Sequence, residues 1–551
     1  MHIDDCTYKR NGKTYRRVLL RNSYRKNGKV CHDTIANLSS CSKEEIQAIK
    51  LAMKHKDNLS QLTELTKGAK IKQGESVGAL WTLWQLAERL GIRDALGNSR
   101  ESKLILWLVL AAVIAQGSRL SAVRLAQQQA ACDVLGITES FHEDDLYQAM
   151  DWLETKQEEI EERLFQLRYK NKKPYFYLYD VTSSYLEGEQ NELGAYGYNR
   201  DKKRGKKQIV IGLMTDDEGY PIAIEVFQGN TQDTQTVHNQ IEKMAKRFGV
   251  SHVILIGDKG MIKKTQVEEL KAIDFHYITA ITKPQIETLL KSGVIQLGLF
   301  DEDLAEVKDQ GERYILRRNP IRAQEIERNR LSKLRALKKA LVQKNQYLKE
   351  HSRASEEIAI KEITEKAEKL KISQWLKIEI RERELQLVID EEKQKELSQL
   401  DGCYALKTDL TSKQINAEEI HARYKGLAEV EKAFRTMKTA LLEIRPIYVR
   451  KANRTRAHVF IIMLAYMLVH HLRHLWREIE LTPEEGIAEL ASICTIKVDI
   501  PGNTAYQTIM DPKPMGRLLL KAADVVLPFS IPNLNIVVDT RKKLVPERKS
   551  Y

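Results

Sequence analysis

Three stretches decide the fold of this chain: PYFYLYD (174–180), QIVIGLMTDDEGYPIAIEVF (208–227) and HVILIGD (252–258). They are rich in β-branched and aromatic residues, which favour strands, and turn residues at 217–219 divide the second stretch in two. Helical patterns follow at 236–248 and 265–272, and HYITAI (276–281) predicts one more strand. Three strands, helix, strand, helix, strand is the order of an α/β fold with a mixed sheet.

The rest of the chain divides around this α/β core by changes in composition. We expect a basic region of short strands and a helix at 1–76, a helical domain at 77–168, two parts of the core at 169–283 and 401–478, an α+β insertion at 284–400, and a C-terminal region without an assigned role at 479–551. The polar stretch TKGAKIKQGES (66–76) is typical of a linker, and a pair of strands is expected around the turn Asn27–Gly28. Charged helix formers at 322–370 predict long exposed helices, and 417–442 predicts another helix.

Length and composition exclude several classes of protein. At roughly 150 residues per domain, 551 residues correspond to about three or four domains. The longest apolar runs, 104–115 and 459–469, are shorter than the ~20 residues of a membrane span, and the N-terminus has no apolar signal core. Six cysteines without a Cys-x-x-Cys pair argue against a disulfide scaffold or a structural zinc site. We therefore expect a cytoplasmic protein without a membrane partner.

The charge of the chain favours a polyanionic partner. Lys plus Arg number 89 and Asp plus Glu number 76, which gives a net charge of +13. The basic residues cluster at 1–40, at 199–207 and at 317–344. The middle cluster supplies candidate DNA-binding residues: Arg200, Lys202, Lys203, Arg204, Lys206 and Lys207. The three clusters either line one long groove or are separate solvated surfaces.

Two aspartates follow apolar strands of the predicted core. Asp180 comes after FYLY, and Asp258 comes after VILIG. Side chains at adjacent strand ends converge at the rim of an open α/β sheet, where ligands bind. Two neighbouring carboxylates repel each other unless cations lie between them, and this donor set suits Mg²⁺. The alternative is that each aspartate only caps a strand or forms a turn.

A third carboxylate is expected on the helix within 417–442. At ~100° per residue, Tyr424, Glu431 and Lys438 form a stripe at the edge of its apolar face. Glu431 would then reach the edge of the sheet, with the other two positioned to contact phosphates. Glu429 lies on a different face and is the weaker candidate. The alternative is an ordinary amphipathic helix with a solvated edge.

Several ordered motifs together resemble a known family. LYDVTSSY (178–185), LIGDKGMI (255–262) and YKGLAEVEKAFRTMK (424–438) are similar to motifs of the bacterial insertion-sequence transposases of the DDE class. The resemblance is to the IS-four-like families, which carry a Tyr-Arg-Glu-Lys signature, and it implies an RNase H-like catalytic core with an insertion at 284–400. It also implies that Asp180, Asp258 and Glu431 form a metal-binding triad for Mg²⁺ or Mn²⁺. Double-stranded DNA would be the substrate of a homodimer in a synaptic complex.

One position departs from the family pattern. The resemblance assigns Tyr424 and Lys438 to the backbone of the transposon end, but Leu427 stands where the signature has Arg. The phosphate contact expected from that Arg is therefore either missing or supplied elsewhere, with Arg435 and Arg423 as the candidates.

The resemblance predicts cleavage at the ends of an insertion sequence and strand transfer into target DNA. A catalytically inactive end-binding protein or repressor, and a host-type RNase H-like nuclease, are the alternatives. The chain has no Gly-x-x-x-x-Gly-Lys loop, so no nucleotide cofactor is expected.

Overall fold

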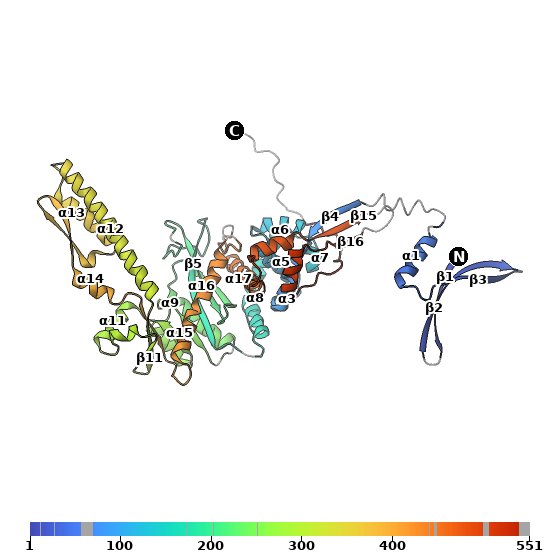
Figure 1. Ribbon diagram of the computed structural model, residues 1–551, viewed down its shortest axis with the longest axis horizontal. Coiled ribbons are helices and arrows are strands. Elements are labelled where there is room, and N and C mark those ends of the chain that lie inside the picture. Colours follow the sequence, from blue (N-terminus) through green and yellow to red (C-terminus); the bar gives the residue numbers. More distant parts are fainter. Residues whose placement is uncertain are drawn as a thin grey trace.

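The computed structural model describes residues 1–10, 13–26, 28–54, 56, 70–171, 173–201, 203–248, 250, 252–439, 441–445, 449–499 and 506–538. Asn27 of the expected N-terminal turn lies outside them. An α/β core and a helical domain form the middle of the molecule, between the N-terminal strands and a protruding helix pair (Figure 1).

The core is a mixed sheet with the strand order of an RNase H-like fold. Its five central strands are β5 (Phe176–Tyr185), β6 (Gln208–Thr215), β7 (Pro221–Gln228), β8 (Ile254–Gly257) and β9 (His276–Ala280). They lie in the order β7-β6-β5-β8-β9, with β5, β8 and β9 parallel and β6 antiparallel to both of its neighbours. The predicted α/β fold with an RNase H-like mixed-sheet core is confirmed.

Three more strands extend this sheet to eight. They are β14 (Cys403–Thr408), β11 (Glu312–Arg318) and β10 (Ala305–Asp309), and each pairs antiparallel with the strand before it. The segment 284–400, expected as an insertion, therefore also supplies two strands of the core sheet. Between β9 and β10 lie α11 (Lys283–Lys291) and a 3-10 turn at Leu297–Asp301.

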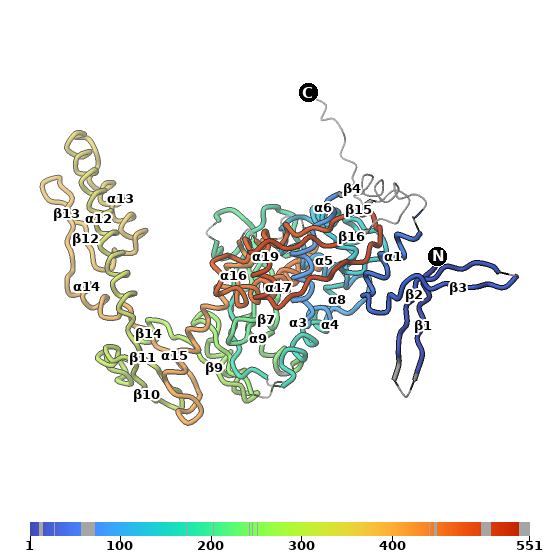
Figure 2. The backbone as a smooth tube through the Cα atoms, turned by 45° about the vertical axis from the view of Figure 1, so that its right-hand side comes forward, coloured from blue at the N-terminus to red at the C-terminus, as the bar shows by residue number. Residues whose placement is uncertain are grey.

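The remainder of 284–400 forms a separate small unit. It contains α12 (Pro320–Glu350), α13 (Glu356–Lys369), a 3-10 turn (Ser373–Trp375), β12 (Leu376–Arg381), β13 (Glu384–Ile389) and α14 (Glu391–Ser398). The long exposed helices expected at 322–370 are α12 and α13, which protrude from the core (Figures 1 and 2). An apolar cluster around Trp375 joins them to the two-stranded sheet.

Helices cover both faces of the core sheet. One face carries α9 (Asp233–Glu242), its π-helical continuation (Lys243–Arg247) and α10 (Lys264–Ala272), whereas the other carries α15 (Ala417–Lys425), α16 (Leu427–Lys438) and α17 (Ala452–Leu475). The single helix expected over 417–442 is wrong. Two helices are present instead, since α15 ends at Lys425, α16 begins at Leu427, and Gly426 lies between them.

The helical domain packs against the core through α17. It consists of α3 (Gly78–Arg89), α4 (Ile92–Leu96), α5 (Arg100–Ile114), α6 (Arg119–Gln128), α7 (Ala131–Leu135) and α8 (Glu143–Arg168). Of the described helices, α17 alone is long and apolar enough to cross a bilayer, and α5 with α6 passes the same test only across a bend of 85°. Because 83% of the most apolar window of α17 is buried inside the protein, we interpret it as a core helix.

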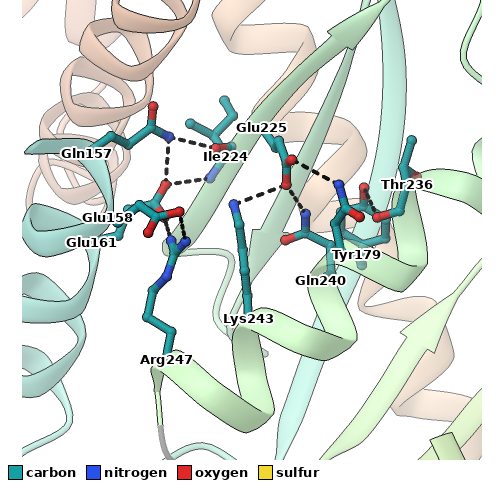
Figure 3. A network of polar contacts seen from close by, with 11 residues as sticks. Gln157, Glu158, Glu161, Tyr179, Ile224, Glu225, Thr236, Gln240, Lys243 and Arg247 are labelled. Carbon is teal, nitrogen blue, oxygen red and sulfur yellow. Dashed lines mark hydrogen bonds and ion pairs between the residues drawn. The ribbon is translucent and has the colours of Figure 1, made fainter. Parts of the chain in front are cut away.

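A buried carboxylate joins α8 to the core (Figure 3). Glu161 is fully buried and accepts hydrogen bonds from the backbone N–H of Ile224 on β7 (3.2 Å), from Gln157 (2.9 Å) and from Arg247 (2.9 Å). The guanidinium of Arg247 also pairs with the exposed Glu158. This cluster connects the helical domain, the sheet and the π-helical turn.

The two ends of the described chain form small sheets. At the N-terminus, β1 (His2–Arg10), β2 (Lys13–Lys26) and β3 (Lys29–Asn37) pair antiparallel beside α1 (Lys43–Lys54). Further on, β4 (Lys70–Ser76) pairs with β15 (Cys494–Asp499), which pairs with β16 (Tyr506–Ile509) between α18 (Pro483–Ala491) and α19 (Pro514–Ala522). The linker expected at 66–76 is therefore wrong for residues 70–76, which form β4.

Candidate active site

The two aspartates lie side by side because of the parallel pairing of β5 with β8. In that register Leu178 is opposite Ile256, and both point into the core on the α16 side of the sheet. Asp180 and Asp258 follow two residues later, so both lie on this face, on strands about 4.8 Å apart. The expectation that Asp180 ends its strand is wrong, because β5 continues to Tyr185; β8 does end at Gly257, just before Asp258.

Glu431 approaches the aspartates from α16. Val430, Phe434 and Met437 are buried on the core side of this helix, which packs on β5, whereas Glu431 is exposed at its edge. All three carboxylates line one cleft, which has a volume of about 720 Å³. The structure therefore brings together the three residues of the predicted triad.

The carboxylates interact electrostatically. Burial, together with the negative charges of Asp258 and Glu431, raises the pKa of Asp180 to about 7, against the opposing effects of the Val181 N–H and Arg200. A bound divalent cation would offset the effects of burial and of the two negative charges, and the hard oxygen donors of the cluster match the chemistry of Mg²⁺. Among the described residues, no group of three or more His, Cys, Asp or Glu side chains is placed so that it could hold a metal ion. The donor set of three carboxylates that line one cleft fits a divalent ion.

Tyr424 is directly connected to the carboxylate cluster. Its hydroxyl donates a hydrogen bond to Oδ1 of Asp258 at 3.4 Å. Burial, with the nearby charge of Asp258, raises the pKa of Tyr424 well above its usual range, so the hydroxyl stays protonated and acts as a donor. The break at Gly426 does not remove Tyr424 from the stripe predicted for a continuous helix, because its side chain still lines the cleft.

Lys438 and Arg435 line the same cleft at the other end of α16. Lys438 donates to the backbone oxygen of Ser183 at 2.6 Å and to Oδ1 of Asp201 at 2.8 Å. Arg435 is exposed, and it has no ion-pair partner among the described residues. It is therefore available for an anion that enters the cleft.

The two arginines considered as replacements for the signature Arg differ in position. Arg423 is held by Asp217 and Glu419 and does not line the cleft, whereas Arg435 does. Leu427 lies one turn before Glu431, lines the cleft and is only 9% exposed. The geometry therefore favours Arg435 for the missing phosphate contact.

Of the basic residues expected to bind DNA at 199–207, Arg200 is the one described residue that lines the cleft, where it pairs with Asp233 at 2.7 Å. The others lie outside it: Lys206 pairs with Glu187 (3.4 Å), Lys207 donates to the backbone oxygen of Glu189 (3.1 Å), Lys203 lies 5.7 Å from the ring centre of Tyr185, and Arg204 is exposed. Lys202 lies outside the described residues.

Sequence reasoning missed several polar residues of the site, among them Asp201, Asp233 and Asn319. Asp233 and Asn319 line the cleft, and Asp201 binds Lys438. The signal for Asp233 was a carboxylate at the start of a helix directly after a core strand, a position that faces the same sheet edge. No local pattern identifies Asn319, which reaches the cleft from the start of α12.

Comparison with known proteins identifies the class of enzyme that carries this arrangement. Residues 171–468 match the transposase DDE domain family. Because this match spans more than half of the chain and includes all three carboxylates, the chain belongs to the DDE transposases of insertion sequences. Residues 5–65 match a second family, the N-terminal domain of IS1634 family transposases. No curated protein matches the chain.

These matches confirm the predicted family and a function in DNA transposition. The narrower assignment to the IS-four-like families stays a prediction. An inactive end-binding protein is not favoured, since the family match and the grouped carboxylates occur together.

Proposed function

We propose that this transposase cleaves DNA at the ends of its insertion sequence and transfers the freed strand into target DNA, with Asp180, Asp258 and Glu431 as the metal-binding triad. The observation that carries the proposal is the convergence of these carboxylates in one cleft with Tyr424 and Lys438. Two bound Mg²⁺ ions, or Mn²⁺ in their place, would supply activation of the attacking oxygen and stabilisation of the leaving oxygen. No nucleotide cofactor is proposed.

The protein groups around the triad orient the reacting phosphodiester. Tyr424 fixes one oxygen of Asp258 by its hydrogen bond, which leaves the other oxygen free to bind a ligand. Arg435 and Lys438, on the same side of the cleft, are assigned to phosphates of the transposon end, because cationic donors form short, charge-assisted bonds to phosphate oxygens. Arg200 is held by Asp233 and would contact the strand near the first aspartate.

The N-terminal sheet offers a second DNA-contacting surface. It forms two hairpins, β1 with β2 and β2 with β3, which diverge in both views (Figures 1 and 2). On the first hairpin the exposed rings of Tyr8 and Tyr15 stack with their centres 5.8 Å apart. Residues 1–40 carry nine Lys or Arg and three Asp. A basic two-stranded ribbon fits the major groove of DNA, and we assign end recognition to this sheet.

We also propose that the enzyme works as a homodimer that holds two transposon ends in a synaptic complex, at the bacterial nucleoid in the cytoplasm. The support is the family resemblance and the chemistry. Each insertion sequence has two ends to be cut, and the described residues of one chain form one cleft lined by the three carboxylates. Binding to DNA should weaken steeply with salt, because phosphate contacts release counterions.

The test uses a labelled duplex that carries the terminal inverted repeat, with and without Mg²⁺ or Mn²⁺. Asp180→Asn, Asp258→Asn and Glu431→Gln should each abolish nicking at the repeat boundary while end binding persists. Glu429→Gln is the matched control, since Glu429 is on the same helix, pairs with Lys432 at 3.4 Å and does not line the cleft. Wild-type cleavage in all three triad variants would disprove the assignment, and nicking without preference for the repeat would favour a general RNase H-like nuclease.

A further inference from the structure

A second, strongly basic cleft lies beside the carboxylate site. It has a volume of about 610 Å³ and is lined by residues of α10, β9, β14 and the loop after Asp258. Its charged lining residues are Lys259, Lys263, Lys264, Lys271, Lys407, Glu268 and Glu312. None of these side chains lines the carboxylate cleft.

The charges of this lysine cleft do not balance internally. Lys271 and Lys407 share a single partner, Glu312, at 2.8 and 3.7 Å. Lys259, Lys263 and Lys264 are exposed, and none of the three has an ion-pair partner in the part of the chain that the structure describes. Five lysines facing two glutamates give the lining a charge of about +3, and a concave surface with this excess attracts phosphate groups.

The lysine cleft and the carboxylate site open at the same sheet edge but on opposite faces. Thr279 and Lys407 are register partners on β9 and β14, and both line the lysine cleft. Thr279 shares its face with Tyr277, which packs in the cluster beneath α9 and α10. The aspartates share their face with Leu178, on the α16 side. Since Lys259 directly follows Asp258, the two clefts meet at the end of β8.

We propose that the lysine cleft binds the backbone of the target DNA during strand transfer. The inference rests on the proposed function, in which Arg435 and Lys438 hold the transposon end on the α16 face. A duplex seated on that face is separated from the lysine cleft by the sheet itself. Strand transfer requires a second phosphodiester at the same carboxylates, with the attacking 3′-oxygen and the leaving 3′-oxygen of the target on opposite sides of the phosphorus. The target therefore leaves the carboxylates in a direction different from that of the transposon end, and the lysine cleft, which meets the carboxylate site at the end of β8, is the path that we assign to it.

In the transfer step, the bond that forms joins the 3′-oxygen of the transposon end to a target phosphorus. The bond that breaks joins that phosphorus to the 3′-oxygen of its neighbour in the target strand. The proton of the attacking hydroxyl is released and the leaving 3′-oxygen takes one up, so no oxidant, reductant or other reactant is needed.

The test compares Lys263→Gln/Lys264→Gln with the wild-type protein on two substrates. A pre-cleaved transposon end with a free 3′-hydroxyl reports strand transfer into a plasmid, and an intact end reports cleavage. Lys291→Gln/Lys369→Gln is the charge-matched control, since both residues are exposed lysines outside the lysine cleft. We expect strand transfer by the cleft variant to fall about tenfold, with cleavage within about twofold of wild type. The slope of the logarithm of target-DNA affinity against the logarithm of salt concentration should become shallower by about 0.9 per lysine lost.

Two results would overturn the inference. Unchanged transfer would show that the lysine cleft does not hold DNA, and an equal loss of cleavage and transfer would show that it holds the transposon end. A wild-type protein that neither cleaves the intact end nor transfers the pre-cleaved end in Mg²⁺ or Mn²⁺ would instead overturn the proposed function, so the two failures are distinguishable.

Discussion

Removing the guanidinium of Arg247 should destabilise the junction between the helical domain and the core. Glu161 is fully buried, and Arg247 is the cation that neutralises it (Figure 3). In Arg247→Leu, the carboxylate would keep only the neutral donors Gln157 and the Ile224 N–H. Breaking a buried ion pair by removing one partner costs about 3–5 kcal/mol, since the remaining charge stays buried without compensation.

Hydrogen exchange measures this loss locally. The amide of Ile224 and its neighbours on β7 should exchange about two to four powers of ten faster in Arg247→Leu, at about 1.4 kcal/mol per power of ten. Glu158→Gln is the matched control, because Glu158 contacts the same guanidinium but its side chain is 79% exposed. An exposed pair contributes at most about 1 kcal/mol, so this variant should change exchange by less than about fivefold.

The two variants together test whether the burial of Glu161 makes Arg247 essential. Equal and small effects of Arg247→Leu and Glu158→Gln would refute the reasoning that burial of Glu161 makes its partner essential. A second substitution, Glu161→Gln in the Arg247→Leu background, should restore part of the protection, because it removes the uncompensated charge while keeping a hydrogen-bonding side chain.

Three further predictions concern the site and its support. Lys438→Met removes the bonds to Ser183 and Asp201, and should lower the salt slope of end binding by about 0.9 in a filter-binding titration. Leu427→Arg should raise that slope by about the same amount, and an unchanged slope would show that its side chain does not reach a phosphate. Burial lowers the pKa of His458 to about 3, so only the unfolded chain gains its proton below pH 6.5, and stability should fall by about 1.4 kcal/mol per pH unit between about pH 6 and 4. In His458→Phe, the free energy of unfolding measured by urea titration should depend less on pH between about pH 6 and 4.

The core and its carboxylates were predictable because their signals are local. Apolar runs placed Asp180 and Asp258 on the sheet, and helical spacing placed Glu431 at the edge of its helix. The length of β5 was not predictable, since VTSSY is polar and resembles the end of a strand. Pairing with β6 continues the strand, and it buries Ser183 and Ser184 completely.

Pairing between distant segments could not be predicted from local patterns either. KIKQGES resembles a linker because it is polar and contains glycine, yet it forms β4 when β15 supplies hydrogen-bonding partners. In the same way, β10 joins the core sheet only through its neighbour β11. The break at Gly426 was missed because the apolar stripe continues across it.

The pairing of β4 with β15 also sets an order of events on the ribosome. Cys494, the first residue of β15, is synthesised 418 residues after Ser76, the last residue of β4 (494 − 76). At about 5–20 residues per second, the nascent chain carries β4 with an open edge for roughly 20–80 s. Any chain that terminates early lacks the strand that covers this edge, and unpaired edges promote association with other chains. A truncated product would therefore expose, between the N-terminal sheet and the helical domain, a strand whose unpaired edge can bind other chains.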